Sequence, residues 1–122
     1  MRVLITGGGG FLGQKLVAAL RDNPVIAGAP VSSLVLADLD APAAMDAPFI
    51  VETVATDISD GASVNTLFNN PPDVIYHLAA VVSGAAEADF DLGMRVNLGG
   101  TMNILDAARK SGRVPIVIFA SS

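Results

Sequence analysis

Short apolar runs alternate along this chain with longer segments in which apolar residues have helical spacing. Apolar runs rich in β-branched residues are typical of buried parallel strands, and stretches rich in glycine, proline or polar residues separate them here. The pattern predicts five strands, at residues 2–6, 33–37, 50–55, 74–78 and 115–120. It predicts helices from about residue 10 to 21, at residues 62–68, and from about residue 87 to 111 with a break near Gly93.

Strands separated by helices indicate right-handed βαβ units. The predicted fold class is therefore α/β, a doubly wound parallel sheet with the strand order 3-2-1-4-5. The apolar run at residues 116–119 would be poorly placed at an uncovered sheet edge. We therefore interpret the sequence as the N-terminal part of a larger protein.

The third predicted helix has an apolar face and two adjacent glycines. Gly99 and Gly100 would each cost about 1 kcal/mol relative to alanine inside a helix, so close packing or a local distortion is expected there. Met94 and Met102 are interpreted as core or interface residues. The residues that fall on one face are Met94, Leu98, Thr101, Leu105 and Ala108.

The turn between the first strand and the first helix has the sequence Thr6-Gly7-Gly8-Gly9-Gly10-Phe11-Leu12-Gly13. A dinucleotide pyrophosphate binds at such turns, because the helix N-terminus offers unpaired N–H groups and the positive end of the helix dipole. The glycines fit Gly8-x-Gly10-x-x-Gly13 and Gly7-x-x-Gly10-x-x-Gly13, and Thr6-Gly7 favours the second frame. In both, Gly10 permits close approach of the phosphates and Gly13 permits close packing of the helix, while Gly8 and Gly9 are interpreted as spacers. The alternative is a flexible turn without a ligand.

Asp38 ends the second predicted strand, 25 positions after Gly13. A carboxylate at this place can accept hydrogen bonds from the adenosine ribose hydroxyls. It would also repel a 2′-phosphate, by about 4 kcal/mol for unit charges about 4 Å apart at an effective dielectric of about 20. No Arg or Lys lies near it in sequence, so NAD is predicted in preference to NADP. The alternative is a solvated loop aspartate, a role that suits Asp40 better.

Composition narrows the function classes. The 122 residues carry a net charge of −5 and are 52% hydrophobic, which argues against a surface for nucleic acid or anionic membranes. With no cysteine and one histidine, the sequence excludes disulfides, thiol catalysis and thiolate or multi-histidine metal sites, and no metal is predicted. No signal peptide or membrane-spanning stretch is visible, so a cytoplasmic location is predicted.

Thr6-Gly7-x-x-Gly10-Phe11-Leu12-Gly13 resembles the fingerprint of the extended short-chain dehydrogenases/reductases, the NAD-dependent epimerase/dehydratase family. The resemblance extends through nearly the whole chain and implies a Rossmann domain over residues 1–122 with NAD as cofactor. Asp57-Ile58 matches the pair that contacts the adenine, and His77-Leu78-Ala79-Ala80 matches the segment that lies along the cofactor. The cofactor-binding residues that the resemblance implies are Gly7, Gly10, Phe11, Leu12, Gly13, Asp38, Asp57, Ile58, Leu78, Ala79 and Ala80.

Two further motifs concern the active site. Residues 96–101 resemble the "VNxxGT" helix segment, in which Asn97 would support the active site, and Phe119-Ala120-Ser121-Ser122 resembles the strand end that carries the catalytic serine, Ser122. Structural alternatives stay open. Asp57 could be a turn or helix-start residue with Ser59 and Asp60, Asn97 could be solvated, and His77 fits a structural role better than a catalytic one.

The proton relay of the family, a Tyr-x-x-x-Lys pair, is not in this sequence, since the one tyrosine is Tyr76 and position 80 is alanine. The resemblance places that pair some 25 residues beyond Ser122, followed by a substrate-binding region, and implies a homodimer. Residues 81–90 are most similar to the D-erythronate dehydrogenase group, which oxidises a sugar acid with NAD. A sugar-acid dehydrogenase is therefore the predicted function. A nucleotide-sugar epimerase or dehydratase and a non-catalytic NAD-binding module are the alternatives.

Overall fold

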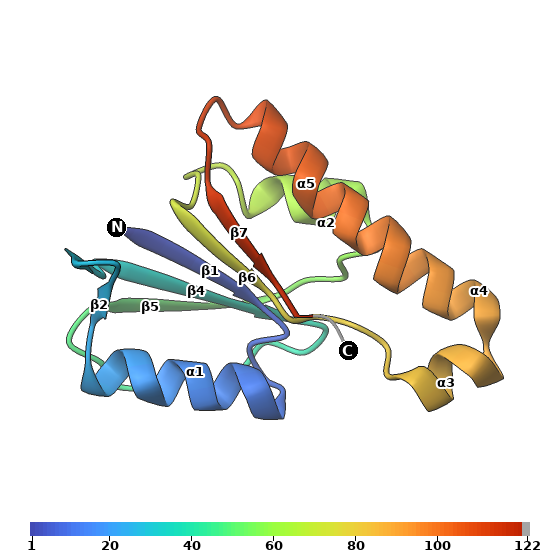
Figure 1. Cartoon of the computed structure of the whole chain (residues 1–122), viewed down its shortest axis with the longest axis horizontal. Coiled ribbons are helices and arrows are strands. Elements are labelled where there is room, and N and C mark those ends of the chain that lie inside the picture. Colours follow the sequence, from blue (N-terminus) through green and yellow to red (C-terminus); the bar gives the residue numbers. More distant parts are fainter. Residues whose placement is uncertain (121–122) are drawn as a thin grey trace.

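The computed structural model of the chain describes residues 1–120. A five-stranded parallel sheet forms the middle layer, with helices on both faces (Figure 1). The strand order is β5-β4-β1-β6-β7, which confirms the predicted order 3-2-1-4-5 and the doubly wound α/β fold. The strands are β1 (Arg2–Thr6), β4 (Ser33–Asp38), β5 (Ile50–Ala55), β6 (Val74–His77) and β7 (Ile116–Phe119).

The central strand β1 is buried on both faces. Helix α1 (Phe11–Asp22) covers one face of the sheet, and α2 (Gly61–Thr66) and α5 (Thr101–Lys110) cover the other (Figure 1). Because side chains alternate along a strand, Val3 and Ile5 pack in the core cluster with α1, and Leu4 packs in the cluster with α5. Packing from both sides fixes the position of the carboxyl end of β1.

The carboxyl ends of the strands line up at one edge of the sheet. Thr6 pairs with Ala37 of β4 on one side and with His77 of β6 on the other. The chain runs from β1 outward to β4 and β5, then returns to the other side of β1 for β6 and β7. The end of β1 is therefore a topological switch point, the place where open α/β sheets bind ligands.

The third predicted helix is not continuous. It consists of α3 (Ser83–Ala88), α4 (Phe90–Gly93), a π-helical segment η1 (Met94–Gly100) and α5. The break lies at Asp89, whose backbone is extended and whose carboxylate accepts the Leu92 N–H at 3.0 Å, as an N-cap does. The predicted break near Gly93 thus exists but lies at Asp89, and the change from α-helix to π-helix follows directly after Gly93. Gly93 has helical dihedrals, and a Cβ there would lie 2.8 Å from the Ala86 Cβ, so this glycine permits packing of α4 on α3.

Most of the residues predicted to share one face of this region lie on its exposed side, and Ala108 is buried. Leu98 and Leu105 are about half exposed, whereas Ile104 and Ala107 are buried against the sheet. Met94 and Met102 are exposed, which excludes a core role for them and leaves the interface role. The local distortion expected at the two glycines is confirmed, since η1 ends at Gly100.

The connection between α1 and β4 contains a small hairpin that the sequence did not reveal. Strands β2 (Val25–Ile26) and β3 (Ala29–Pro30) pair across Ala27 and Gly28, both with positive φ, as a two-residue hairpin turn of type I′ requires. At the other end of the chain, β7 pairs with β6 alone among the described residues. Ile116 and Phe119 of β7 are more than half exposed.

Candidate dinucleotide-binding site

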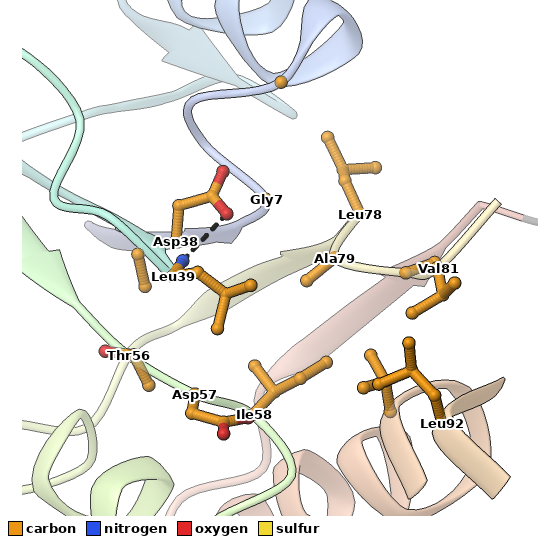
Figure 2. A pocket seen from close by; sticks show the side chains of 14 residues that line it. Gly7, Asp38, Leu39, Thr56, Asp57, Ile58, Leu78, Ala79, Val81 and Leu92 are labelled. Atoms are coloured by element: carbon orange, nitrogen blue, oxygen red, sulfur yellow. Dashed lines mark hydrogen bonds between the residues drawn. The ribbon is translucent and has the colours of Figure 1, made fainter. Parts of the chain in front are cut away.

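A cleft of about 360 Å³ opens at the carboxyl ends of the strands, around the switch point (Figure 2). The glycine turn, the end of β4, the segment after β5 and the segment after β6 all contribute to its lining. The structure therefore brings together four segments that are far apart in the sequence. The predicted cofactor-binding residues that line the cleft are Gly7, Gly10, Asp38, Asp57, Ile58, Leu78, Ala79 and Ala80.

The glycine turn is tightly packed, and two of its glycines have no room for a side chain. Gly7 has a φ of +73°, and a Cβ there would lie 2.8 Å from the Ala79 backbone nitrogen. At Gly13 a Cβ would overlap the Gly7 carbonyl oxygen and lie 2.9 Å from the Gly8 Cα. Only glycine at these two positions lets the turn contact both the segment after β6 and the first turn of α1.

Phe11, Leu12 and Gly13 do not line the cleft, and they form the first turn of α1. The Phe11 and Leu12 side chains are largely exposed. Their backbone N–H groups lie in the first turn of the helix, where N–H groups have no acceptor within the helix. This helix has no capping side chain and no acidic residue in its first turn, so no carboxylate there competes with an anionic ligand.

Asp38 faces the glycine turn. Its Oδ2 accepts the Gly9 N–H at 2.9 Å and its Oδ1 accepts the Leu39 N–H at 2.9 Å, the latter contact being visible in Figure 2. Gly9 is therefore more than a spacer, because a Cβ there would lie 3.1 Å from the Asp38 Oδ2. Each carboxylate oxygen retains a lone pair for a ribose hydroxyl. Asp40 lies exposed in the loop beyond, as the sequence predicted.

Asp57 forms a turn and lines the cleft as well. Its Oδ1 accepts the Ser59 N–H at 2.9 Å and the Ser59 hydroxyl at 2.7 Å, which confirms the turn interpretation. The next residue, Ile58, is buried beneath the π-helical segment, where a Cβ on Gly100 would lie 2.6 Å from the Ile58 Cδ1. Gly100 therefore permits the close packing that the sequence predicted.

Asn97 holds the segment after β6 in place. Its Oδ1 accepts the Val81 N–H at 2.7 Å, and its Nδ2 donates to the Val81 carbonyl oxygen at 3.0 Å. The alternative of a solvated side chain is therefore wrong. Because both amide atoms bind the Val81 backbone, Asn97 is a positioning residue. It lines a smaller hollow of about 290 Å³ next to the cleft. Ser122, the predicted catalytic serine, lies outside the described residues.

His77 is buried between two threonines at the end of β6. Its Nδ1 lies 2.7 Å from the Thr6 Oγ1, and its Nε2 lies 2.9 Å from the Thr101 Oγ1. Burial lowers the pKa of the imidazole below its ordinary value, so the neutral form is favoured. His77 does not line the cleft, and this geometry agrees with the structural role that the sequence favoured.

Apolar side chains that sequence reasoning missed complete the cleft. Leu39, Val81, Leu92 and Val96 line it, and Figure 2 shows Leu39 and Leu92 around the same opening as Ile58. Two of these had a usable signal, since Leu39 follows Asp38 directly and Val96 begins the segment that resembles the family. Leu92 had none, because its position depends on the helix break before it. Apolar walls with a few polar groups are typical of sites that bind small molecules and cofactors.

The described part of the chain contains neither a candidate metal site nor a candidate membrane span. Within residues 1–120 no group of three or more His, Cys, Asp or Glu side chains could hold a metal ion. Among the helices of the same residues, none has the length and apolar character that crossing a membrane requires. The cytoplasmic location and the absence of nucleic-acid and membrane partners stay predictions.

Fold and site together define a Rossmann-type dinucleotide-binding domain. Its features are the glycine turn after β1, the acidic residue Asp38 at the end of β4, and a cleft at the switch point. The sequence matches the NAD dependent epimerase/dehydratase family over residues 3–122, and the chain belongs to that family. The predicted family and the predicted class of cofactor are thereby confirmed.

The relatives include sugar-acid dehydrogenases and sugar epimerases, and also dehydrogenases of other substrates, such as L-threonine 3-dehydrogenase of Sus scrofa. D-erythronate dehydrogenase of Cupriavidus necator is 46% identical, over the whole of this chain and 39% of the relative. The crystal structure of a nucleoside-diphosphate-sugar epimerase from Agrobacterium tumefaciens is 40% identical with a TM-score of 0.92, over all of this chain and 37% of that one. Uronate dehydrogenase from the same organism, in complex with NAD, is 31% identical with a TM-score of 0.77, over 99% of this chain and 40% of that one. The chain thus spans about two fifths of the length of these relatives.

Proposed function

We propose that this chain is the NAD-binding part of a dehydrogenase that oxidises a hydroxyl of a sugar acid, with D-erythronate as the first substrate to test. The observation that carries the proposal is the cleft in which Asp38, the glycine turn and residues 78–81 meet. The 46% identity to a D-erythronate dehydrogenase supports the choice of substrate.

The residues of the cleft fit NAD. The N–H groups of the first turn of α1 suit the pyrophosphate, the Asp38 carboxylate suits the ribose hydroxyls, and the apolar walls at Ile58 and Leu92 suit the adenine. Close packing at Gly7 and Gly13 brings backbone, rather than side chain, to the place where phosphates bind. These residues bind and orient the cofactor and exclude a 2′-phosphate.

NAD, when bound, accepts a hydride from the substrate carbon that is oxidised. In the proposal, Ser122 hydrogen-bonds the reacting oxygen, and a tyrosine from a Tyr-x-x-x-Lys pair removes its proton. That pair is expected beyond residue 122, together with a substrate-binding region. Asn97 contributes by holding the Val81 backbone beside the cleft.

The test is an oxidation assay on the full-length protein with NAD and D-erythronate, followed by the absorbance of NADH. We expect NADH and the 2-oxo acid in equal amounts, and a much lower rate with NADP. A uronic acid serves as the second substrate, since a uronate dehydrogenase is among the structural neighbours. Intact NAD binding without NADH formation from any sugar acid would refute the dehydrogenase proposal.

A sugar epimerase is the second candidate, supported by the TM-score of 0.92 with a nucleoside-diphosphate-sugar epimerase. An epimerase regenerates its cofactor in each turnover, so NAD would co-purify in equal amount with the protein, and a UDP- or dTDP-sugar would be converted without net NADH. A non-catalytic NAD-binding module would bind NAD and turn over neither class of substrate. The three outcomes exclude one another.

We also propose that the full-length protein is a homodimer. Leu98, Met102 and Leu105 form an exposed apolar stripe with spacing i, i+4, i+7 along η1 and α5, and each is about half exposed or more. A second copy of the same helices would cover this stripe. Analytical ultracentrifugation of the wild type and of Leu105→Glu tests the proposal, with a dimer expected for the first and a monomer for the second. A wild-type monomer would contradict it.

A further inference from the structure

The imidazole of His77 connects the ends of two strands to the helical region. It lies at the last position of β6, between Thr6 at the end of β1 and Thr101 at the start of α5. His77 is only 2% exposed, so an unpaired ring nitrogen there would be costly. Each nitrogen has one hydroxyl partner, and the question is which atom donates in each contact.

The neighbouring contacts decide the direction of every hydrogen bond. The Thr101 Oγ1 lies 2.6 Å from the Asn97 carbonyl oxygen, which can only accept, so the Thr101 hydroxyl donates there. The Thr101 oxygen must then accept from His77, whose proton therefore resides on Nε2. The His77 Nδ1 accepts the Thr6 hydroxyl, and the Thr6 oxygen accepts the Ala79 N–H at 3.3 Å.

The result is one directed chain of hydrogen bonds, from the Ala79 N–H through Thr6, His77 and Thr101 to the Asn97 carbonyl. We call it the His77 relay. Its first member, Ala79, belongs to the segment that lines the cleft, and its last member, Asn97, holds Val81 of that segment through its side chain. Residues 79–81 are thus held at both ends.

We propose that the His77 relay is a positioning device for the cofactor cleft, and that His77 acts in its Nε2–H tautomer to hold residues 79–81 against the end of β1 before any ligand binds. The proposal concerns a positioning residue, since His77 lies outside the cleft lining. Its effect on cofactor affinity rests on the proposed function, whereas its effect on the backbone does not.

The tautomer is the first test. Nitrogen-15 NMR of the labelled full-length protein reports which ring nitrogen carries the proton, and the signals of His77 are those lost in His77→Gln. We expect the neutral Nε2–H tautomer, because the Thr101 hydroxyl is committed to Asn97. A neutral Nδ1–H form, or an averaged mixture of both tautomers, would overturn the proposal.

The second test removes one link without changing shape. Thr101→Val keeps the volume and loses the hydroxyl, and Thr101→Ser restores it. For the valine variant we expect faster hydrogen exchange at the Ala79 and Val81 amides and an NAD dissociation constant raised about tenfold. For the serine variant we expect both within about twofold of the wild type. Thr66→Val is the control, because the Thr66 hydroxyl donates to the exposed Ser63 carbonyl oxygen in α2, outside the cleft lining.

Steady-state kinetics of the full-length protein distinguish a positioning role of Thr101 from a general loss of structure in the variant. Thr101→Val is expected to raise the KM for NAD and to leave kcat at saturating NAD near that of the wild type. Unchanged amide exchange in a folded Thr101→Val protein would refute the relay. If wild-type protein binds no NAD, the proposed function fails, while tautomer and amide exchange still decide the relay. If the valine variant does not fold, the wild-type tautomer and Thr101→Ser decide it.

Discussion

Replacing Asp38 tests the cofactor preference on which the proposed function depends. The carboxylate is held toward the glycine turn by the N–H groups of Gly9 and Leu39, so it lies where the ribose of a bound dinucleotide would be. Asp38→Asn preserves the shape of the side chain and removes its charge. We expect NADP to bind better and NAD to bind less well.

The size of the effect follows from charge and burial. Two unit charges about 4 Å apart repel by about 4 kcal/mol at an effective dielectric of about 20, and by about 1 kcal/mol in bulk water. Asp38 is half-buried and two N–H groups partly offset its charge, so about 1–2 kcal/mol of repulsion is expected. Loss of a charged hydrogen bond to the ribose weakens NAD binding by about 1 kcal/mol more. The preference for NAD should therefore fall roughly 30- to 150-fold.

Isothermal titration calorimetry with NAD and NADP on the full-length protein measures both affinities. The matched control is Asp40→Asn. It removes the same formal charge, but at an exposed residue two positions after Asp38. Its ratio of NADP to NAD dissociation constants should stay within about twofold of the wild type. An unchanged ratio in Asp38→Asn, or an equal change in both variants, would refute the assignment of Asp38 to the ribose.

Further predictions concern stability. Gly13→Ala should lower the melting temperature markedly, because the new Cβ would overlap the Gly7 carbonyl oxygen. In Gly84→Ala the new Cβ meets open space, so this variant should stabilise the folded protein by up to about 1 kcal/mol. Equal melting temperatures of the two variants in thermal denaturation would contradict this. Burial lowers the pKa of His77, so the unfolded chain binds a proton more readily than the folded one. The free energy of unfolding should therefore decrease as the pH falls below about 6.5, until the lower pKa of the folded state is passed. Urea denaturation at several pH values checks this, and the slope in that range should be smaller in His77→Gln.

Much of the fold could be predicted because the strands of the five-stranded sheet have local signals in the sequence. Residues 2–6 and 33–37 are apolar runs that a parallel sheet buries on both faces, and the structure has strands at both. The end of the second of these runs also positions Asp38, so one pattern indicated an element and a site residue together. The glycine turn carried its own signal, since Gly7 and Gly13 occupy places where no side chain fits.

Contacts between distant residues decide what the sequence could not show. The Ser59 hydroxyl donates to the Asp57 carboxylate two positions before it, and such a local contact can be anticipated from the sequence. The His77 imidazole, in contrast, contacts the hydroxyl of Thr101, which lies 24 positions further along the chain. Sequence reasoning therefore placed His77 in a structural role without identifying its partners. The apolar cleft residue Leu92 was missed for the same reason, because its place depends on how α4 packs after the break at Asp89.

The π-helical segment η1 shows how contacts outside a helix shape the third helical region. Of the residues predicted to share one face, Met94, Leu98 and Leu105 are exposed, whereas Ala108 near the end of α5 is buried. The two glycines indicate that a distortion is possible, but its position is stabilised by packing of Gly100 on Ile58 and by the Thr101 contact to His77. Because both partners lie outside the helix, the segment is a property of the tertiary structure, and loss of the Thr101 hydroxyl should loosen the π segment and the cleft together.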